Sequence, residues 1–118
     1  MLVEDNEMNL DLATELLEDV GIQLTIARNG LQALEALEHG TFDAVLMDIQ
    51  MPEMDGYQAT RNIRQNGFNN IPIIAMTANA MKGDRELCLE AGMNDYITKP
   101  IKREIVFQVL GKWLNNSN

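Results

Sequence analysis

The sequence predicts an α/β domain with a doubly wound, five-stranded parallel sheet in a three-layer sandwich. The length of 118 residues corresponds to one domain, residues 1–118. Five short apolar runs alternate with five stretches of helical periodicity, as in successive parallel βαβ units. The runs at 44–47 and 71–76 are apolar throughout, which is typical of strands that helices cover on both faces.

The first half of the chain begins with a short predicted strand, Met1–Val3. Apolar residues in 13–20 recur at i, i+3, i+4 and i+7, which predicts a helix that a glycine then ends. A strand at Ile22–Ala27 leads through a turn to a second helix, over 31–37, with leucines on one face and a glycine after it. The third strand is Ala44–Met47.

The second half continues the alternation. A helix is expected over 57–65, ended near Gly67, and a fourth strand at Ile71–Met76. The fourth helix covers 81–91 and ends at a glycine, which can adopt the left-handed conformation that helix ends favour. The fifth strand is Asp95–Thr98, and apolar residues over 105–114 predict the last helix.

Composition and charge exclude several functional classes. Eighteen acidic against nine basic residues give a net charge of −9, which argues against nucleic acid or a membrane surface as a direct partner. Residues 1–60 hold thirteen acids and one base (net −12), and residues 61–118 five acids and eight bases (net +3), so two electrically different sides are expected. A single cysteine rules out an internal disulfide, and no signal peptide or membrane-length apolar run is found, which favours the cytoplasm.

Polar side chains follow four of the five predicted strands. Glu4 and Asp5 follow the first strand, Asp48 the third, Thr77 the fourth and Lys99 the fifth. Ligands of parallel sheets bind beyond the carboxyl ends of the strands, so these groups should converge on one edge. Three close carboxylates repel one another and call for a hard cation such as Mg²⁺. A carboxylate can also act as a nucleophile toward phosphorus.

Four segments of the chain together resemble one family: LVEDNEMN (2–9), VLMDIQMPEMDGYQATRNIR (45–64), IPIIAMTANAM (71–81) and AGMNDYITKPI (91–101). They resemble the CheY-like receiver domains of bacterial response regulators, and most of all the receivers of hybrid sensor histidine kinases. The resemblance covers nearly the whole chain, in the same order and spacing. It implies a flavodoxin-like (βα)5 fold with strand order 2-1-3-4-5.

The resemblance also implies a phosphorylated residue and a metal site. Asp48 matches the phosphoacceptor, which takes its phosphoryl group from phosphohistidine on a histidine kinase or a histidine phosphotransfer domain. Asp5 and Asp48 match direct ligands of Mg²⁺, for which Mn²⁺ is a substitute. Glu4 matches a carboxylate that acts through water, and Gln50 the residue that offers its backbone carbonyl.

A second set of residues matches the conformational switch. Thr77 resembles the switch hydroxyl, Lys99 the phosphate-binding lysine, Tyr96 the aromatic rotor, and Ala78 a backbone donor to the phosphoryl group. Gln50 and Asn79 match the positions that tune dephosphorylation, and since neither is a carboxylate, slow autodephosphorylation is expected. Two residues have structural roles: Pro100, which follows a cis peptide in this family, and Gly56, which allows an unusual turn.

The expected partners are the phosphodonor and an output partner. The acidic first helix is the expected docking side for the donor. The face of the fourth helix, fifth strand and fifth helix is the expected contact with an effector or a second copy, and its bases are Lys82, Arg85, Lys102, Arg103 and Lys112. On this reading the chain is a signalling phosphoacceptor rather than an enzyme.

Other functions are weighed against this one. A haloacid-dehalogenase-type hydrolase would need an acid two residues after the nucleophile, where this chain has Gln50, and a cap insertion for which 118 residues leave no room. A flavodoxin-type FMN site conflicts with the acids after the first strand. A receiver-like module that is never phosphorylated would lack an essential residue, and none is missing. Members of the family that the chain resembles usually begin a few residues earlier, so the first strand is expected to be truncated at its N-terminus, as at a fragment boundary. A stand-alone regulator and a piece of a hybrid kinase both stay open.

Overall fold

Five strands form one parallel sheet in the order β2-β1-β3-β4-β5, which confirms the predicted fold class and strand order. The computed structural model describes residues 1–19, 24–49, 55–77, 82–99 and 101–115. The strands are β1 (Leu2–Val3), β2 (Ile26–Ala27), β3 (Val45–Asp48), β4 (Ile73–Thr77) and β5 (Asp95–Thr98). The helices are α1 (Glu7–Asp19), α2 (Gly30–His39), α3 (Gly56–Gln65), α4 (Lys82–Ala91) and α5 (Arg103–Asn115).

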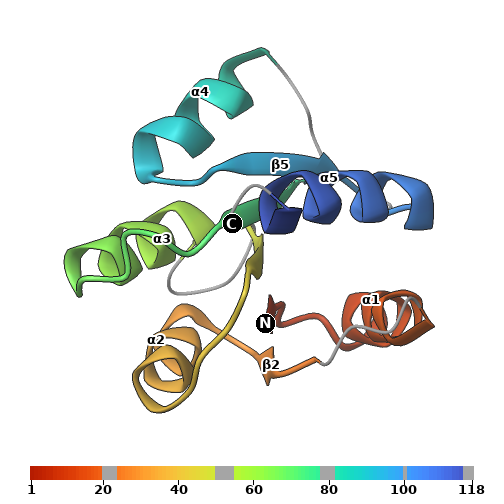
Figure 1. The fold of residues 1–118 in the computed structure, drawn as a ribbon, viewed down its shortest axis with the longest axis horizontal. Coiled ribbons are helices and arrows are strands. Elements are labelled where there is room, and N and C mark those ends of the chain that lie inside the picture. The colour runs from red at the N-terminus through yellow and green to blue at the C-terminus, as the bar shows by residue number, and fades with distance from the viewer. Residues whose placement is uncertain (20–23, 50–54, 78–81, 100, 116–118) are drawn as a thin grey trace.

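Helices cover the sheet on both faces. Helices α2, α3 and α4 lie on one face, and α1 and α5 lie on the other (Figure 1). Each face has its own apolar cluster, one built around Val3, Met47 and Ile73 and the other around Leu2, Leu46 and Ile74. Adjacent strand residues belong to opposite clusters because side chains alternate across a sheet. None of the helices in the described ranges is both long enough and apolar enough to cross a membrane.

Four of the strands differ from the prediction at their ends. β1 begins at Leu2 rather than Met1, and β3 begins at Val45 rather than Ala44. β2 begins at Ile26, so residues 24–25, which the prediction included, lie before the strand. β4 begins at Ile73 rather than Ile71, since Pro72 has no backbone N–H to donate to a strand pairing. β4 also includes Thr77, which pairs with Thr98 of β5. β3 likewise extends to Asp48, which pairs with Met76. The candidate phosphoacceptor is therefore the last residue of a central strand rather than the first residue of a loop.

Side-chain caps begin three of the helices. The side-chain oxygens of Asn6, Asn29 and Asp55 accept hydrogen bonds from the backbone N–H groups of Asn9, Gln32 and Gln58. The turn predicted after β2 therefore includes the cap of α2. The glycine stops predicted after α3 and α4 are also present, because Gly67 and Gly92 have φ of +98° and +107°.

Arg64 holds two loops together at the end of the sheet opposite the acidic residues. Its guanidinium makes five hydrogen bonds of 2.7–2.9 Å to four acceptors, the carbonyls of Phe68, Ile71 and Gly92 and the side-chain oxygen of Asn94. The same Asn94 oxygen accepts the backbone N–H of Ile73, so the starts of β4 and β5 are joined. This arrangement fixes the register of the two strands that carry Thr77 and Lys99.

Candidate functional site

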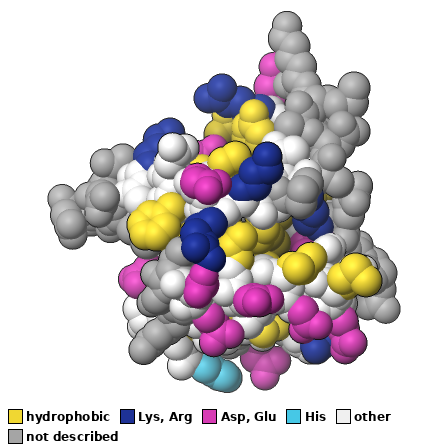
Figure 2. All heavy atoms as spheres, turned by 90° about the vertical axis from the view of Figure 1, so that its right-hand side faces the viewer, with side chains coloured by type: hydrophobic (Ala, Val, Ile, Leu, Met, Phe, Trp, Pro, Cys, Tyr) yellow, Lys and Arg dark blue, Asp and Glu magenta, His cyan; other side chains and the backbone are white. Residues whose placement is uncertain are grey.

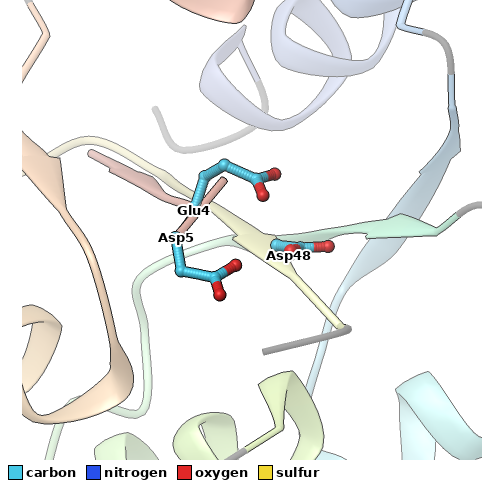
Figure 3. A group of neighbouring side chains, drawn as sticks. All are labelled: Glu4, Asp5 and Asp48. Atoms are coloured by element: carbon cyan, nitrogen blue, oxygen red, sulfur yellow. The ribbon is translucent and has the colours of Figure 1, made fainter. Parts of the chain in front are cut away.

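Three carboxylates meet at the carboxyl ends of β1 and β3 (Figure 3). Glu4 and Asp5 follow β1, and Asp48 ends β3. One carboxylate oxygen from each of the three lies within 4.8 Å of the others. The side chains of Glu4 and Asp48 are each only 2% exposed, whereas Asp5 is half-buried. This depth is unusual for acids and requires compensation by cations or hydrogen bonds.

Strand pairing brings the three acids together. β1 lies between β2 and β3, and Val3 pairs with Met47 in a parallel register. Glu4 and Asp48 are the next residues along these two strands, so their backbones lie side by side. The Glu4 N–H donates to the Ala27 carbonyl at 3.0 Å, which extends the pairing by one residue. Contacts across the sheet therefore place residues that are 44 positions apart in one site.

Lys99 supplies the positive charge at this site. Its Nζ lies 2.7 Å from Asp48 Oδ1 and 3.3 Å from Glu4 Oε2. Burial alone would lower the pKa of Lys99, but hydrogen bonding and charge attraction from Asp48 and Glu4 raise it overall, so the ammonium stays charged. Burial, together with the neighbouring Asp48, raises the pKa of Glu4 above its ordinary value. One ammonium therefore only partly offsets three acids.

The donor set suits a hard divalent cation. All three side chains offer oxygen, which Mg²⁺ prefers. Mg²⁺–oxygen distances of about 2.1 Å place opposite ligands roughly 4.2 Å apart. The three carboxylate oxygens lie within 4.8 Å of one another, a limit slightly larger than this distance between opposite ligands. Two carboxylates in direct contact and the third acting through a water molecule would fit this spacing.

The structure describes two of the remaining predicted site residues, Thr77 and Tyr96. Thr77 is buried at the end of β4, and its carbonyl accepts the backbone N–H of Lys99 at 2.7 Å. Tyr96 is half-buried on β5 and packs against the apolar cluster on the α2–α3–α4 face. Four predicted residues lie outside the described part of the chain: Gln50, Ala78, Asn79 and Pro100.

Gly56 has a different role from the predicted turn. Among the described glycines, positive φ angles occur at Gly67 and Gly92, and Gly56 instead begins α3. Its N–H donates to the Ile49 carbonyl at 2.9 Å, and a Cβ at this position would lie 2.4 Å from the Asp48 carbonyl oxygen. Glycine is needed here because the helix packs directly on the backbone of Asp48. The sequence marks the glycine but not this contact.

The sequence interpretation also missed two contacts. The Lys99–Glu4 ion pair was not foreseen, because Glu4 was assigned only to the metal and Lys99 only to phosphate. The side chain of Asp95 accepts a hydrogen bond from Trp113 Nε1 at 2.9 Å, linking β5 to α5. The available signal for the second contact was a predicted strand that begins with an acid, but the partner of that acid is 18 residues away in the sequence.

Comparisons with known proteins agree on one family. The model of the response regulator receiver domain matches residues 1–110. The sensor protein GacS of Pseudomonas syringae pv. syringae is 44% identical over 96% of this chain and 13% of its own length. More generally, the chain spans 5% to 15% of the length of the first curated relatives that it matches.

Solved structures share the fold. The receiver domain of the sensor histidine kinase PA1611 from Pseudomonas aeruginosa PAO1 has a TM-score of 0.88 and 46% identity, over 97% of this chain and 94% of that one. Its crystal structure has a magnesium ion coordinated in the active-site cleft. A co-crystal structure from Saccharomyces cerevisiae, of the histidine phosphotransfer protein Ypd1 and the receiver domain of Ssk1, matches with a TM-score of 0.90 and 28% identity, over 98% of this chain and 88% of that one.

Proposed function

The chain belongs to the family of response regulator receiver domains of two-component phosphorelays, and from this premise we propose that it accepts a phosphoryl group from phosphohistidine onto Asp48. One observation carries the proposal: the Asp48 carboxylate is buried at the end of a central strand, 2.7 Å from the Lys99 ammonium and beside two further acids. A buried carboxylate with a purely structural role would also need a cation such as Lys99, but two further acids beside it only add repulsion. The family match removes the reason to consider a hydrolase of the haloacid-dehalogenase type.

The transfer is a displacement at phosphorus. An oxygen of Asp48 forms the new P–O bond, the P–N bond to the donor imidazole breaks, and the electrons of that bond leave with the imidazole. Lys99 stays protonated and pairs with the phosphoryl oxygens, since its pKa is raised and its ammonium already contacts Asp48. The chain thus supplies the nucleophile and a fixed cation. The donor supplies the phosphoryl group.

A divalent cation completes the proposed site. Asp5 and Asp48 would bind Mg²⁺ directly, Glu4 through water and Gln50 through its backbone carbonyl, with Mn²⁺ as a substitute. When bound, the cation offsets the charge that develops on the phosphoryl oxygens. The all-oxygen donor set and the magnesium ion in the PA1611 receiver domain support this assignment.

Phosphorylation would then change the conformation. We assign the switch to Thr77, whose hydroxyl would join the phosphoryl oxygens with the backbone of Ala78, and to Tyr96, whose half-buried ring would move into the space that Thr77 vacates. Gln50 and Asn79 would set the rate at which water removes the phosphoryl group. The burial of Thr77 beside the Asp48 strand end supports the first step.

A groove between α1 and α5 is the proposed docking site of the donor, a histidine kinase or a histidine phosphotransfer domain. Glu4, Lys99, Leu12, Leu16 and Ile101 are among the residues that line a hollow of about 270 Å³ beside α1. A second hollow, also lined by Leu12 and Leu16, reaches Arg103 at the start of α5. Figure 2 shows this side of the molecule: acidic side chains run below an apolar hollow, and most basic side chains lie above it. A partner seated here would reach Asp48. A histidine kinase takes its phosphoryl group from ATP, and on that ground we propose a cytoplasmic location for the domain.

The output partner is proposed to bind elsewhere. The α4–β5–α5 face carries Tyr96, and Arg85 and Lys112 line a small hollow beside it. A second copy of the domain or an effector would contact this face. Its separation from the groove between α1 and α5 would leave the donor side free.

Intact-protein mass spectrometry tests the function. With acetyl phosphate and Mg²⁺, the parent should gain the mass of one phosphoryl group and Asp48→Asn should gain none. Asp11→Asn is the matched control, because it removes an exposed acid from α1 and should leave the adduct unchanged. An undiminished adduct on Asp48→Asn would move the site elsewhere. No adduct on the parent, from acetyl phosphate or from a phosphorylated histidine phosphotransfer protein, would indicate a non-phosphorylated interaction module.

A further inference from the structure

The side chain of Asp95 joins β5 to the last turns of α5. Its Oδ1 accepts the backbone N–H of Tyr96 at 2.8 Å, and its Oδ2 accepts Trp113 Nε1 at 2.9 Å. The Lys112 ammonium lies 3.9 Å from the same Oδ2 and 5.4 Å from the centre of the Trp113 ring. We call Asp95, Lys112 and Trp113 the Asp95 clamp. Both carboxylate oxygens are engaged, and the side chain is only 24% exposed.

The other end of β5 contacts the phosphorylation site. Thr98 pairs with Thr77, the Lys99 N–H donates to the Thr77 carbonyl at 2.7 Å, and the Lys99 ammonium lies 2.7 Å from Asp48 Oδ1. β5 has four residues, so it spans roughly 10 Å at about 3.3 Å per residue. It is the last strand in the sheet order and pairs with β4 on its inner side. A short edge strand therefore has the site at one end and the clamp at the other.

We propose that the Asp95 clamp passes the state of the Asp48 site to α5. This inference rests on the proposed function, because a phosphoryl group on Asp48 must first displace Thr77 or Lys99. Displacement of either residue shifts the end of β5. A hydrogen-bonded strand of four residues transmits the shift to Asp95, which holds Trp113. The geometry of the Asp95–Trp113 hydrogen bond then changes.

The clamp is a second output, separate from Tyr96. Successive side chains point to opposite faces of a sheet, so Asp95 faces α5 while Tyr96 packs on the α2–α3–α4 face. The Tyr96 N–H is nevertheless held by Asp95. The same strand movement would therefore reach α4 through the Tyr96 ring and α5 through the Asp95 carboxylate. A partner that contacts both helices would sense both changes.

The single tryptophan makes the clamp directly measurable. In a ¹H–¹⁵N spectrum the chain has one indole resonance, and its proton is the one that Trp113 donates to Asp95. Adding beryllofluoride with Mg²⁺, a mimic of the phosphoryl group, should displace this resonance at the same concentrations that displace the amides next to Asp48. In Asp95→Ala and Asp95→Asn the indole displacement should be lost or reduced, while the amides next to Asp48 still respond.

Two further variants, Glu104→Gln and Asp95→Asn, serve as controls. Glu104→Gln removes an exposed acid from the first turn of α5 and should leave the indole response unchanged. Asp95→Asn preserves side-chain volume in case Asp95→Ala does not fold. The inference is overturned if the parent indole stays still while the amides next to Asp48 move, or if both Asp95 variants keep the full indole response. A parent that shows no response anywhere would overturn the proposed function, and this inference with it.

Discussion

Replacing Gly56 with alanine tests how the chain holds the backbone of Asp48. A Cβ at position 56 would lie 2.4 Å from the Asp48 carbonyl oxygen and 2.8 Å from Ile49 Cα. Both are backbone atoms in or beside β3, so neither can rotate away as the end of a side chain would. The first turn of α3 is also held in place, because the Gly56 carbonyl accepts the buried Thr60 hydroxyl at 2.8 Å.

The size of the effect follows from two opposing contributions. Ordinary contacts between non-bonded carbon atoms are about 3.5–4.0 Å, so the added methyl group overlaps the backbone by roughly 1 Å. Overpacking of this kind costs roughly 1–3 kcal/mol. Alanine is better than glycine in a helix by up to about 1 kcal/mol, which offsets part of this cost. We expect Gly56→Ala to lose about 2 kcal/mol of unfolding free energy and roughly 8 °C in Tm.

Urea unfolding of two glycine variants separates these contributions. Gly111 lies within α5, and a Cβ there would meet nothing within 4 Å. The free energy of unfolding of Gly111→Ala should therefore rise by about 0.5–1 kcal/mol, because only the preference of alanine over glycine in a helix contributes. The same glycine-to-alanine substitution should thus lower the free energy of unfolding at position 56 and raise it at position 111. A Gly56→Ala domain as stable as the parent, beside a stabilised Gly111→Ala domain, would refute the close approach of α3 to Asp48.

Two further predictions concern charged side chains. Burial and the neighbouring Asp48 raise the pKa of Glu4 above 4.5, so the folded state binds this proton more tightly and loses stability as the pH rises above 4.5. In thermal melts with EDTA, the Tm of Glu4→Gln should rise relative to that of the parent as the pH increases above 4.5, and a Tm difference that does not vary with pH would contradict this. Arg64→Lys loses the guanidinium fork and should cost about 1–3 kcal/mol in urea. The exposed Arg61→Lys should change by less than about 0.5 kcal/mol, and equal midpoints for the two variants would count against the loop contacts of Arg64.

Local patterns predicted the element order and the fold because they depend on short-range chemistry. β5 lies at the predicted Asp95–Thr98, and the helix stops at Gly67 and Gly92 have the backbone angles that favour glycine. The ends of β3 and β4 were less predictable. Asp48 and Thr77 are polar, so a hydrophobicity pattern places them outside the strands. Pairing with Met76 and Thr98 on neighbouring strands includes them.

The candidate site was predictable as a set of strand-end residues, but its contacts were not. Parallel topology alone brings Glu4, Asp48 and Lys99 to one edge of the sheet. The Lys99–Glu4 ion pair depends on side-chain conformations that no local pattern encodes. The approach of Gly56 to Asp48 depends on how α3 packs against β3. The Asp95–Trp113 contact depends on the position of α5 across the edge strand.

The charges of the site explain why lysine and a divalent cation would both be needed. With every group ionised, the three carboxylates and the Lys99 ammonium carry a formal charge of −2. Burial, and after it the neighbouring Asp48, raises the pKa of Glu4, and a proton on Glu4 would lower this excess of negative charge. A divalent cation would remove the excess without a proton. Phosphorylation then replaces one carboxylate charge with up to two phosphoryl charges, which a site holding Lys99 alone would not neutralise. The repulsion among the carboxylates would thus favour binding of a divalent cation, and the bound cation would in turn favour the proposed phosphoryl group.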